Sequence, residues 1–175
     1  MTTQPEFTLE CSLEREAIRS FKSMLMCLDR FGKELFLEAN AEKLTLRTLN
    51  AAQSAFIVFT LHASFFGHFK IAAGASASVK LHLKNVTSIF RSTFGVDRMW
   101  LQVAATESDD EASGHDFMRV QLQCASGLRK KFDLALQEVS SMNAVYDKSS
   151  CPHVIRAEPT MLLDCLKNFP STQSE

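Results

Sequence analysis

The 175-residue chain is 46% hydrophobic and 22% charged, which supplies apolar material for a substantial core and excludes a disordered chain on composition. Its formal net charge is -1, from 19 Lys and Arg against 20 Asp and Glu, so the whole molecule has no basic excess that would attract a polyanion. Because no long apolar run or signal-peptide pattern is present, we expect a soluble intracellular protein with no membrane contact.

The first half of the chain is predicted to form a strand, a helix and three strands. Phe7 to Cys11 alternates apolar and polar residues as a strand does. Ser12 is a suitable cap for the helix that follows, which we expect to end near Gly32. An antiparallel meander is then predicted at Glu34–Ala39, Lys43–Leu49 and Ser54–Leu61.

The second half repeats this order. Val79–Lys84 is predicted as a strand, and Asn85–Phe94 as a shorter helix that stops at Gly95. Three more strands are predicted at Arg98–Ala104, Phe117–Cys124 and Leu128–Leu136. Since both halves have the same order of elements, we predict a doubled α+β domain over residues 1–137. The acidic stretch Glu107–Gly114 is interpreted as a solvated hairpin insertion.

Two further segments follow this doubled unit. Residues 138–150 have no clear period and are interpreted as a connector, and residues 151–175 as the truncated start of a second domain. Cys151–Ala157 is strand-like, and Pro159 is expected to open a helix. The apolar residues of that helix are Met161, Leu162, Cys165, Leu166 and Phe169. Because this helix has no evident sheet of its own, we expect the segment after Ser150 to be poorly supported.

Basic residues gather on one face of each of the first two predicted helices. At about 100° per residue, the apolar face of the first helix contains Ala17, Ile18, Phe21, Met24, Leu25 and Leu28. Nearly opposite lies an arc without acidic residues, formed by Arg15, Arg19, Lys22 and Arg30. On the second helix, Lys84 and Arg91 project away from a cluster formed by Val86, Ile89, Phe90 and Thr93.

Such one-signed faces suit contacts with nucleic-acid phosphates that do not depend on base sequence. No aromatic residues are interleaved with the basic ones, so base stacking is not expected. The alternative, that Lys and Arg only solubilise exposed helices, stays open at this point.

A series of short stretches carries a family resemblance. In chain order they are Arg30-Phe31-Gly32-Lys33-Glu34-Leu35, Leu44-Thr45-Leu46-Arg47-Thr48-Leu49-Asn50, Ser54-Ala55-Phe56, Phe65-Phe66, Ile89-Phe90-Arg91-Ser92, Gly127-Leu128-Arg129-Lys130, Ala144-Val145-Tyr146-Asp147 and Ser150-Cys151-Pro152-His153. They resemble the Rad-nine subunits of the DNA-damage checkpoint clamp, and the doubled plan with basic helices is similar to a sliding-clamp domain related to proliferating cell nuclear antigen. The matches run in order from about Phe7 to Phe169.

The resemblance implies a subunit of a heterotrimeric nuclear ring that encircles DNA, with the helices lining the hole. Such a subunit is not an enzyme and needs no cofactor. A clamp loader would place the ring at damaged or stalled DNA, where it would recruit checkpoint signalling and repair proteins. Against this family plan, we expect these 175 residues to contain only the start of a second domain and none of the long phosphorylatable tail.

The resemblance also implies two protein-binding surfaces. The strand that would pair with a neighbouring subunit includes Arg129, Lys131, Asp133 and Ala135. An ordinary exposed edge guarded by basic residues is the alternative. A groove for partner peptides would be framed by Leu49, Gln53, Ser54, Met142, Val145 and Tyr146. The alternative for the apolar residues of the connector is a tether to the core.

Two other functions are weighed against the clamp. A metal-dependent DNA exonuclease would need a carboxylate cluster, and the close one is Asp109, Asp110, Glu111 and Asp116. These residues fall in the predicted insertion rather than on rigid elements, which disfavours two-metal chemistry. The histidines and cysteines are scattered without metal-ligand or nucleophile spacing. The other alternative is a protein-interaction module that does not contact DNA.

Overall fold

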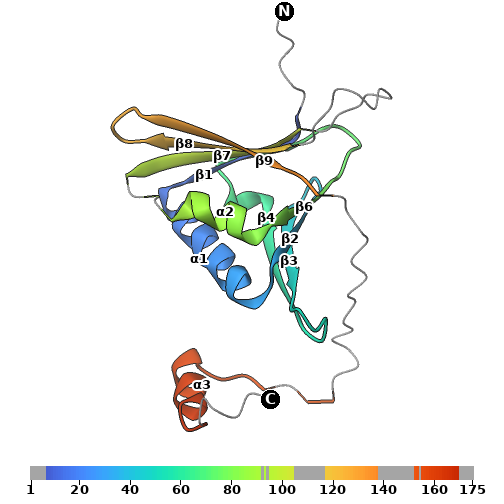
Figure 1. The fold of residues 1–175 in the computed structure, drawn as a ribbon, viewed down its shortest axis with the longest axis vertical. Coiled ribbons are helices and arrows are strands. Elements are labelled where there is room, and N and C mark those ends of the chain that lie inside the picture. The colour runs from blue at the N-terminus through green and yellow to red at the C-terminus, as the bar shows by residue number, and fades with distance from the viewer. Residues whose placement is uncertain are drawn as a thin grey trace, which may run out of the picture. The chain divides into compact units, whose positions relative to one another are not determined.

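A computed structural model describes residues 7–91, 93, 95–104, 117–137, 152–153 and 155–169. The chain divides into two units, Met1–Ser141 and Met142–Glu175. The elements of the first unit, in chain order, are β1 (Phe7–Glu14), α1 (Arg15–Phe31), β2 (Glu34–Ala39), β3 (Lys43–Leu49), β4 (Phe56–His62), the short 3-10 helix η1 (Ala63–Phe65), β5 (His68–Ile71), β6 (Ala77–His82), α2 (Leu83–Phe90), β7 (Val96–Ala104), β8 (Phe117–Cys124) and β9 (Arg129–Ala135). The second unit contains α3 (Pro159–Leu166), and all elements are drawn in Figure 1.

The two halves of the first unit exchange their first strands. β1 lies between β5 and β7 in a five-stranded sheet of order β5-β1-β7-β8-β9. β6 pairs with β2 and completes a four-stranded sheet of order β4-β3-β2-β6. All pairs are antiparallel, with Cys11 opposite Leu101 in one sheet and Leu37 opposite Val79 in the other. The predicted α+β class and doubled order of elements are confirmed, whereas the exchange depends on pairing between distant segments.

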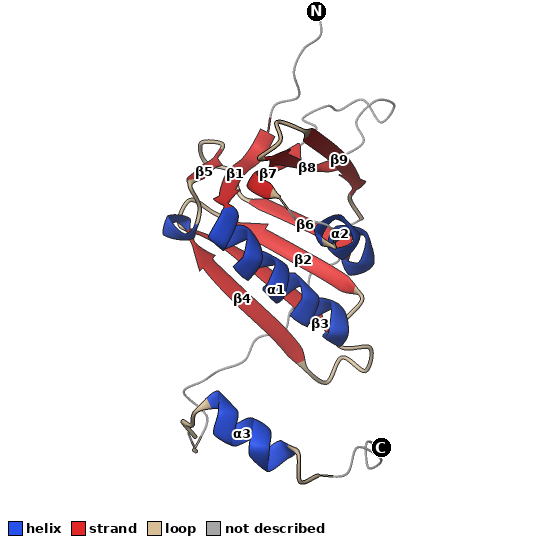
Figure 2. Ribbon diagram, turned by 90° about the vertical axis from the view of Figure 1, so that its left-hand side faces the viewer, coloured by secondary structure: helices blue, strands red, loops and turns tan. Residues whose placement is uncertain are grey.

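Helices α1 and α2 lie side by side against the two sheets (Figures 1 and 2). The Phe21 ring of α1 contacts the Phe90 ring of α2, with 5.8 Å between the ring centroids. The predicted apolar face of α1 is the buried one, and Ile18, Phe21, Leu25 and Leu28 are each at most 2% exposed. Ala17 and Met24 are half-buried against the same core. Burying one face in this way leaves the opposite faces of both helices open to solvent.

The start of α1 differs from its prediction. β1 extends to Glu14, and the helix begins at Arg15 without a side-chain cap. Ser12 is therefore not the cap: it is buried in β1, between His68 of β5 and Trp100 of β7. The ladders on both sides of β1 hold this backbone extended, and this tertiary pairing outweighs the local capping signal.

α2 is shorter than predicted and begins earlier. β6 ends at His82, and Leu83 is the first helical residue. Its amide donates to the Lys33 carbonyl oxygen at 2.9 Å, and its side chain is fully buried. The helix ends at Phe90 rather than Phe94. β2, β3 and β8 have the predicted bounds, and the other predicted strands differ from β4, β6, β7 and β9 by a few residues at their ends.

The sequence prediction missed η1 and β5. β5 is only four residues long and pairs with one side of β1, so its alternation is too short to be distinctive. Phe66 is 8% exposed, and its ring lies 5.1 Å from that of Phe69, measured between centroids. This cluster attaches the end of the first half to the sheet edge.

The second unit contains a helix but no described strand. α3 starts with Pro159 in its first turn, as predicted. The predicted strand Cys151–Ala157 is wrong for the residues that the structure describes, which are not in a ladder. A strand needs a hydrogen-bonded neighbour, and none of the described segments pairs with this one. None of the described helices is long and apolar enough to cross a membrane.

Candidate nucleic-acid interface and docking edge

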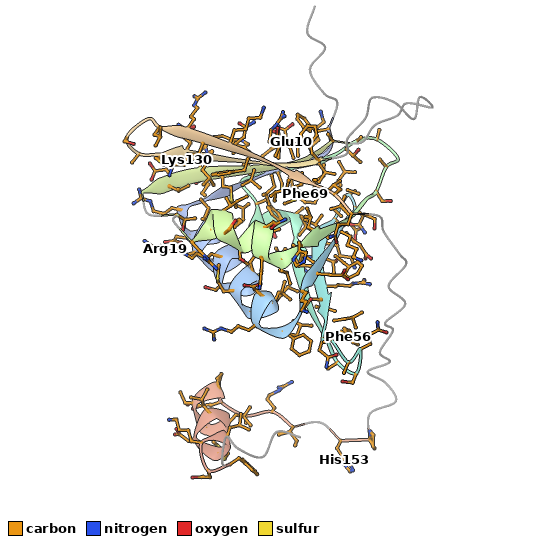
Figure 3. All side chains as sticks on the ribbon, viewed as in Figure 1. Glu10, Arg19, Phe56, Phe69, Lys130 and His153 are labelled. Carbon is orange, nitrogen blue, oxygen red and sulfur yellow. The ribbon has the colours of Figure 1, made fainter. Side chains whose placement is uncertain are left out.

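The exposed face of α1 carries basic side chains that differ in their electrostatic partners. Arg19 and Arg30 are exposed and Lys22 is half-buried. Arg15 is also exposed, but its guanidinium pairs with the Asp97 carboxylate of β7. Asp97 is far from α1 in sequence, so a helical-face argument could not include it. Within the described parts of the chain, Arg19, Lys22 and Arg30 have no ion pair, and Figure 3 shows Arg19 projecting from α1.

α2 adds two exposed cations, Lys84 in its first turn and Arg91 at its C-terminal cap. Neither forms an ion pair with another described residue. The two helices are fastened together by the Phe21–Phe90 contact and by the Thr87 hydroxyl, which donates to Asp29 Oδ2 at 3.3 Å. Helix packing thus brings the basic residues of the two halves onto one side of the sheets.

The C-terminal end of α1 opens into a hollow of about 510 Å³. Arg30 and Lys84 both line it, together with Lys33, which follows the helix. Sequence reasoning did not include Lys33 because it lies outside any helical face. The carboxylates of this hollow are engaged elsewhere: Asp29 accepts from Thr87, and Glu34 pairs with Lys80 at 2.9 Å. Asp29 keeps its charge in the hollow, but Arg30, Lys33 and Lys84 form no ion pair within the described residues and outnumber it.

The predicted peptide groove is described on one side only. Leu49 is half-buried at the end of β3, and Gln53 and Ser54 are exposed in the following turn. Gln53 has a φ of 54°, and the Asn50 side chain holds the turn by accepting from the Ser54 amide at 2.9 Å. Leu49 and Gln53 also line the basic hollow at the end of α1. The remaining predicted groove residues, Met142, Val145 and Tyr146, lie outside the described residues.

β9 is the last strand of the five-stranded sheet, so one of its edges has no neighbour in that sheet. Its backbone pairs with β8, with Asp133 opposite Arg119. The Arg119 guanidinium donates from Nε and Nη2 to the two carboxylate oxygens of Asp133, at 2.7 and 2.9 Å. These hydrogen bonds lower the pKa of Asp133 and keep it charged.

Successive β9 side chains point to opposite faces of the sheet. Arg129, Lys131, Asp133 and Ala135 share one face, and all four are exposed. On the other face, Lys130, Phe132 and Leu134 line a hollow of about 440 Å³ together with Ile89 of α2. Figure 3 labels Lys130 at this edge.

Nucleophilic and metal-binding groups do not converge in the described ranges. Burial raises the pKa of Cys11 to about 12, so this thiol stays protonated at neutral pH. No three His, Cys, Asp or Glu side chains gather as a metal site among the described residues. The carboxylates Asp109, Asp110, Glu111 and Asp116, and the predicted acidic insertion that holds them, lie outside those residues.

Comparison with solved structures defines the class of fold first. The structure is similar to a crystal structure of PCNA from Thermococcus kodakaraensis, with a TM-score of 0.65 and 17% sequence identity over 83% of this chain and 52% of that chain. The chain therefore has the PCNA-like sliding-clamp fold. The family follows from the sequence, because the profile of the Rad9 family matches residues 21–175. This chain belongs to the Rad9 family.

Two curated relatives agree with this assignment. The chain is 24% identical over 170 residues to the "Cell cycle checkpoint control protein Rad9" of Drosophila melanogaster, covering 97% of this chain and 35% of that protein. It is 25% identical over 195 aligned positions to the "DNA repair protein rad9" of Schizosaccharomyces octosporus, covering 95% of this chain and 45% of that protein. The chain thus spans less than half the length of these relatives.

Proposed function

We propose that this chain is the amino-terminal clamp domain, with the start of a second domain, of a non-catalytic checkpoint-clamp subunit. The single observation that carries this is the pairing of two helices on one side of the sheets, each with exposed cations opposite its buried face. Family membership and the printed names of the two relatives, which refer to cell-cycle checkpoint control and DNA repair, support the same function.

The proposed DNA-facing residues are Arg19, Lys22, Arg30, Lys84 and Arg91, together with Lys33 at the end of α1. Arg15 belongs to the same face, but its ion pair with Asp97 reduces its expected contribution to DNA binding. Their side chains would contact phosphates without reading bases, because they are widely spaced along the two helices. A sequence-independent contact of this kind permits a ring to move along DNA. Because the chain's net charge is -1, its attraction to DNA would have to come from this local concentration of positive side chains.

The ring would be a heterotrimer in the nucleus, placed on DNA by a clamp loader. β9 would supply the edge that pairs with one neighbouring subunit. Residues 1–137 would form the clamp domain, 138–150 the connector and 151–175 the beginning of the second domain. A groove between the turn at Gln53 and the connector would recruit checkpoint signalling and repair proteins through Leu49, Ser54, Met142, Val145 and Tyr146.

The test uses the full-length protein assembled with the two other checkpoint-clamp subunits and a clamp loader. An encircling protein is retained on closed circular DNA and lost after the circle is cut, whereas one that binds by surface charge alone leaves both at the same rate. Equal retention on circular and linear DNA would refute the ring. Failure of the three subunits to co-purify would remove the assignment to a heterotrimer, and nuclease activity of the purified complex would favour the exonuclease.

A further inference from the structure

We propose that β9 selects a neighbouring protein strand that has carboxylates at alternate positions on one face and apolar side chains on the other. The inference rests on the proposed function, in which β9 is a subunit interface, and adds the chemistry of the neighbour. The residues that would carry the selection are Arg129 and Lys131, and Lys130 adds positive charge on the opposite face of the strand.

These three consecutive cations lie at the unpartnered edge of the sheet. All three are exposed. Arg129 and Lys130 have no ion pair within the described ranges, and Lys131 Nζ is 3.8 Å from Asp133 Oδ2. That carboxylate is already bonded by Arg119 through both of its oxygens. The edge therefore presents an excess of positive charge with little internal compensation.

The pleat of β9 determines which side chains of a neighbouring strand would lie beside each of its own side chains. Arg129 and Lys131 lie on one face, so carboxylates at two alternate positions of the neighbour would reach them together. On the opposite face, Phe132 and Leu134 are half-buried beside Ile89, in the hollow of about 440 Å³. Intervening apolar side chains of the neighbour fit there. The expected partner is an extended strand that is acidic on one face and apolar on the other.

The other strands at sheet ends of this chain do not have that pattern. β4, β5 and β6 are the remaining end strands of the two sheets. Their sequences are FIVFTLH, HFKI and ASVKLH, without an Asp or Glu in any of them. An antiparallel second copy of β9 would offer Asp133 as its carboxylate, and Arg119 already bonds both oxygens of that side chain. Among the described end strands, therefore, none supplies free carboxylates at alternate positions, and the proposed partner strand lies outside this part of the chain.

DNA is the competing anionic ligand, but the chemistry of the edge favours a peptide. An open strand presents carbonyl oxygens as well as amides. Phosphate oxygens accept hydrogen bonds and cannot donate to those carbonyls, whereas a peptide strand satisfies both groups. The apolar side chains Phe132 and Leu134 would also gain no partner from a phosphate.

The experiment compares two charge-reversed variants of the full-length protein in assembly with the two other clamp subunits. Arg129→Glu combined with Lys131→Glu alters the proposed selector. The matched control combines Lys43→Glu with Lys70→Glu, which makes the same charge change at exposed positions on other strands. Circular dichroism and melting confirm that both variants fold. Association is measured by analytical ultracentrifugation over a range of NaCl concentrations.

We expect the selector variant to bind its neighbour about tenfold more weakly or worse, and the control to assemble like the unaltered protein. Salt should weaken the unaltered complex and have less effect on the variant. Restored assembly on replacing acidic residues of the neighbour's edge strand with Lys would identify the pairing. Normal assembly of the selector variant at all salt concentrations would overturn charge selection without affecting the clamp proposal. A selector variant that assembles normally and loses only DNA retention would overturn it in the same way. If the unaltered chains did not assemble, the proposed function itself would fail.

Discussion

At the scale of single residues, Gly32 is restricted by the space around it. Its φ of -138° is extended backbone that any residue adopts, so conformational freedom is not the reason for glycine. A Cβ at this position would collide with the Thr48 hydroxyl and the Leu49 carbonyl oxygen. Thr48 is fully buried and donates to the Glu34 carbonyl oxygen at 2.6 Å, so it has little room to move. This close approach joins the end of α1 to β3.

Gly32→Ala is expected to lower the free energy of unfolding by about 1–3 kcal/mol, because the new methyl group must displace Thr48 or the β3 backbone. Urea denaturation measures this change. Gly67→Ala is the matched control, since its Cβ would lie 3.4 Å from its nearest neighbour, Ser12 Oγ, which is an ordinary van der Waals distance. Equal stability of the two variants would show that the backbone near Gly32 relaxes freely.

Arg15 and Arg19 differ in their expected contribution to DNA binding. Both are exposed on α1, but only Arg15 pairs with Asp97. We expect Arg19→Ala in the assembled clamp to weaken DNA binding equally for all sequences and to reduce the salt slope by about 1. Arg15→Ala should have a smaller effect, because Asp97 already offsets its charge. Fluorescence titrations with duplex DNA at several salt concentrations measure both effects. A larger effect of Arg15→Ala would contradict the offset by Asp97, and no effect of either variant would contradict the proposed DNA-facing side.

At the scale of elements, β8 and β9 are held together by their ladder and by the Arg119–Asp133 pair. Asp133 is directly opposite Arg119, and its side chain is 42% exposed. The Arg119 guanidinium also lies over the Phe117 ring, 4.7 Å from its centroid. This side-chain cluster orients β9 without covering its open edge.

Asp133→Asn is expected to destabilise the chain at pH 7 by about 1 kcal/mol or less, because solvent screens a partly exposed pair. Since Arg119 lowers the folded-state pKa of Asp133, the pair stabilises the fold above the unfolded pKa of about 3.9 and loses this contribution as pH falls through the lower folded pKa. The difference in unfolding free energy between variant and unaltered chain should therefore shrink in acid. A difference that is constant from neutral to strongly acidic pH would rule out this role.

At the scale of the whole molecule, the two units differ in the burial of their apolar side chains. The first has a continuous core between its helices and sheets. In the second, Met161 and Leu166 of α3 are 62% and 64% exposed, and Phe169 is 71% exposed. A helix of this length has little stability without a surface against which to bury such residues.

Limited trypsin digestion of the 175-residue chain should cut after Arg156 and Lys167 before it cuts within the first unit. Both residues are exposed in the second unit, whereas Arg47 and Lys80 lie within paired strands of the four-stranded sheet. Mass spectrometry of early fragments measures the order of cleavage. If the segment after Ser150 resists trypsin as well as Arg47 and Lys80 do, then it is supported in a way that its exposed side chains do not indicate.

The sequence by itself determined the doubled order of elements, the buried face of α1 and the family. These features are encoded locally: alternation defines strands, helical spacing of residues such as Phe21 and Leu25 defines a buried face, and ordered short matches define a relative. The basic faces were recognised for the same reason. Ser12 shows the limit of local signals, since a suitable cap is overridden when neighbouring strands hold it extended.

Only the tertiary structure decided the exchange of β1 and β6 between sheets, the ion pair of Arg15 with Asp97 and the meeting of Arg30, Lys33 and Lys84 in one hollow. The physical reason is that these arrangements join segments distant in sequence, whose contacts are selected by burial of a common core rather than by local propensity. The bare positive edge of β9 likewise became visible only once the order of strands placed it at the end of its sheet.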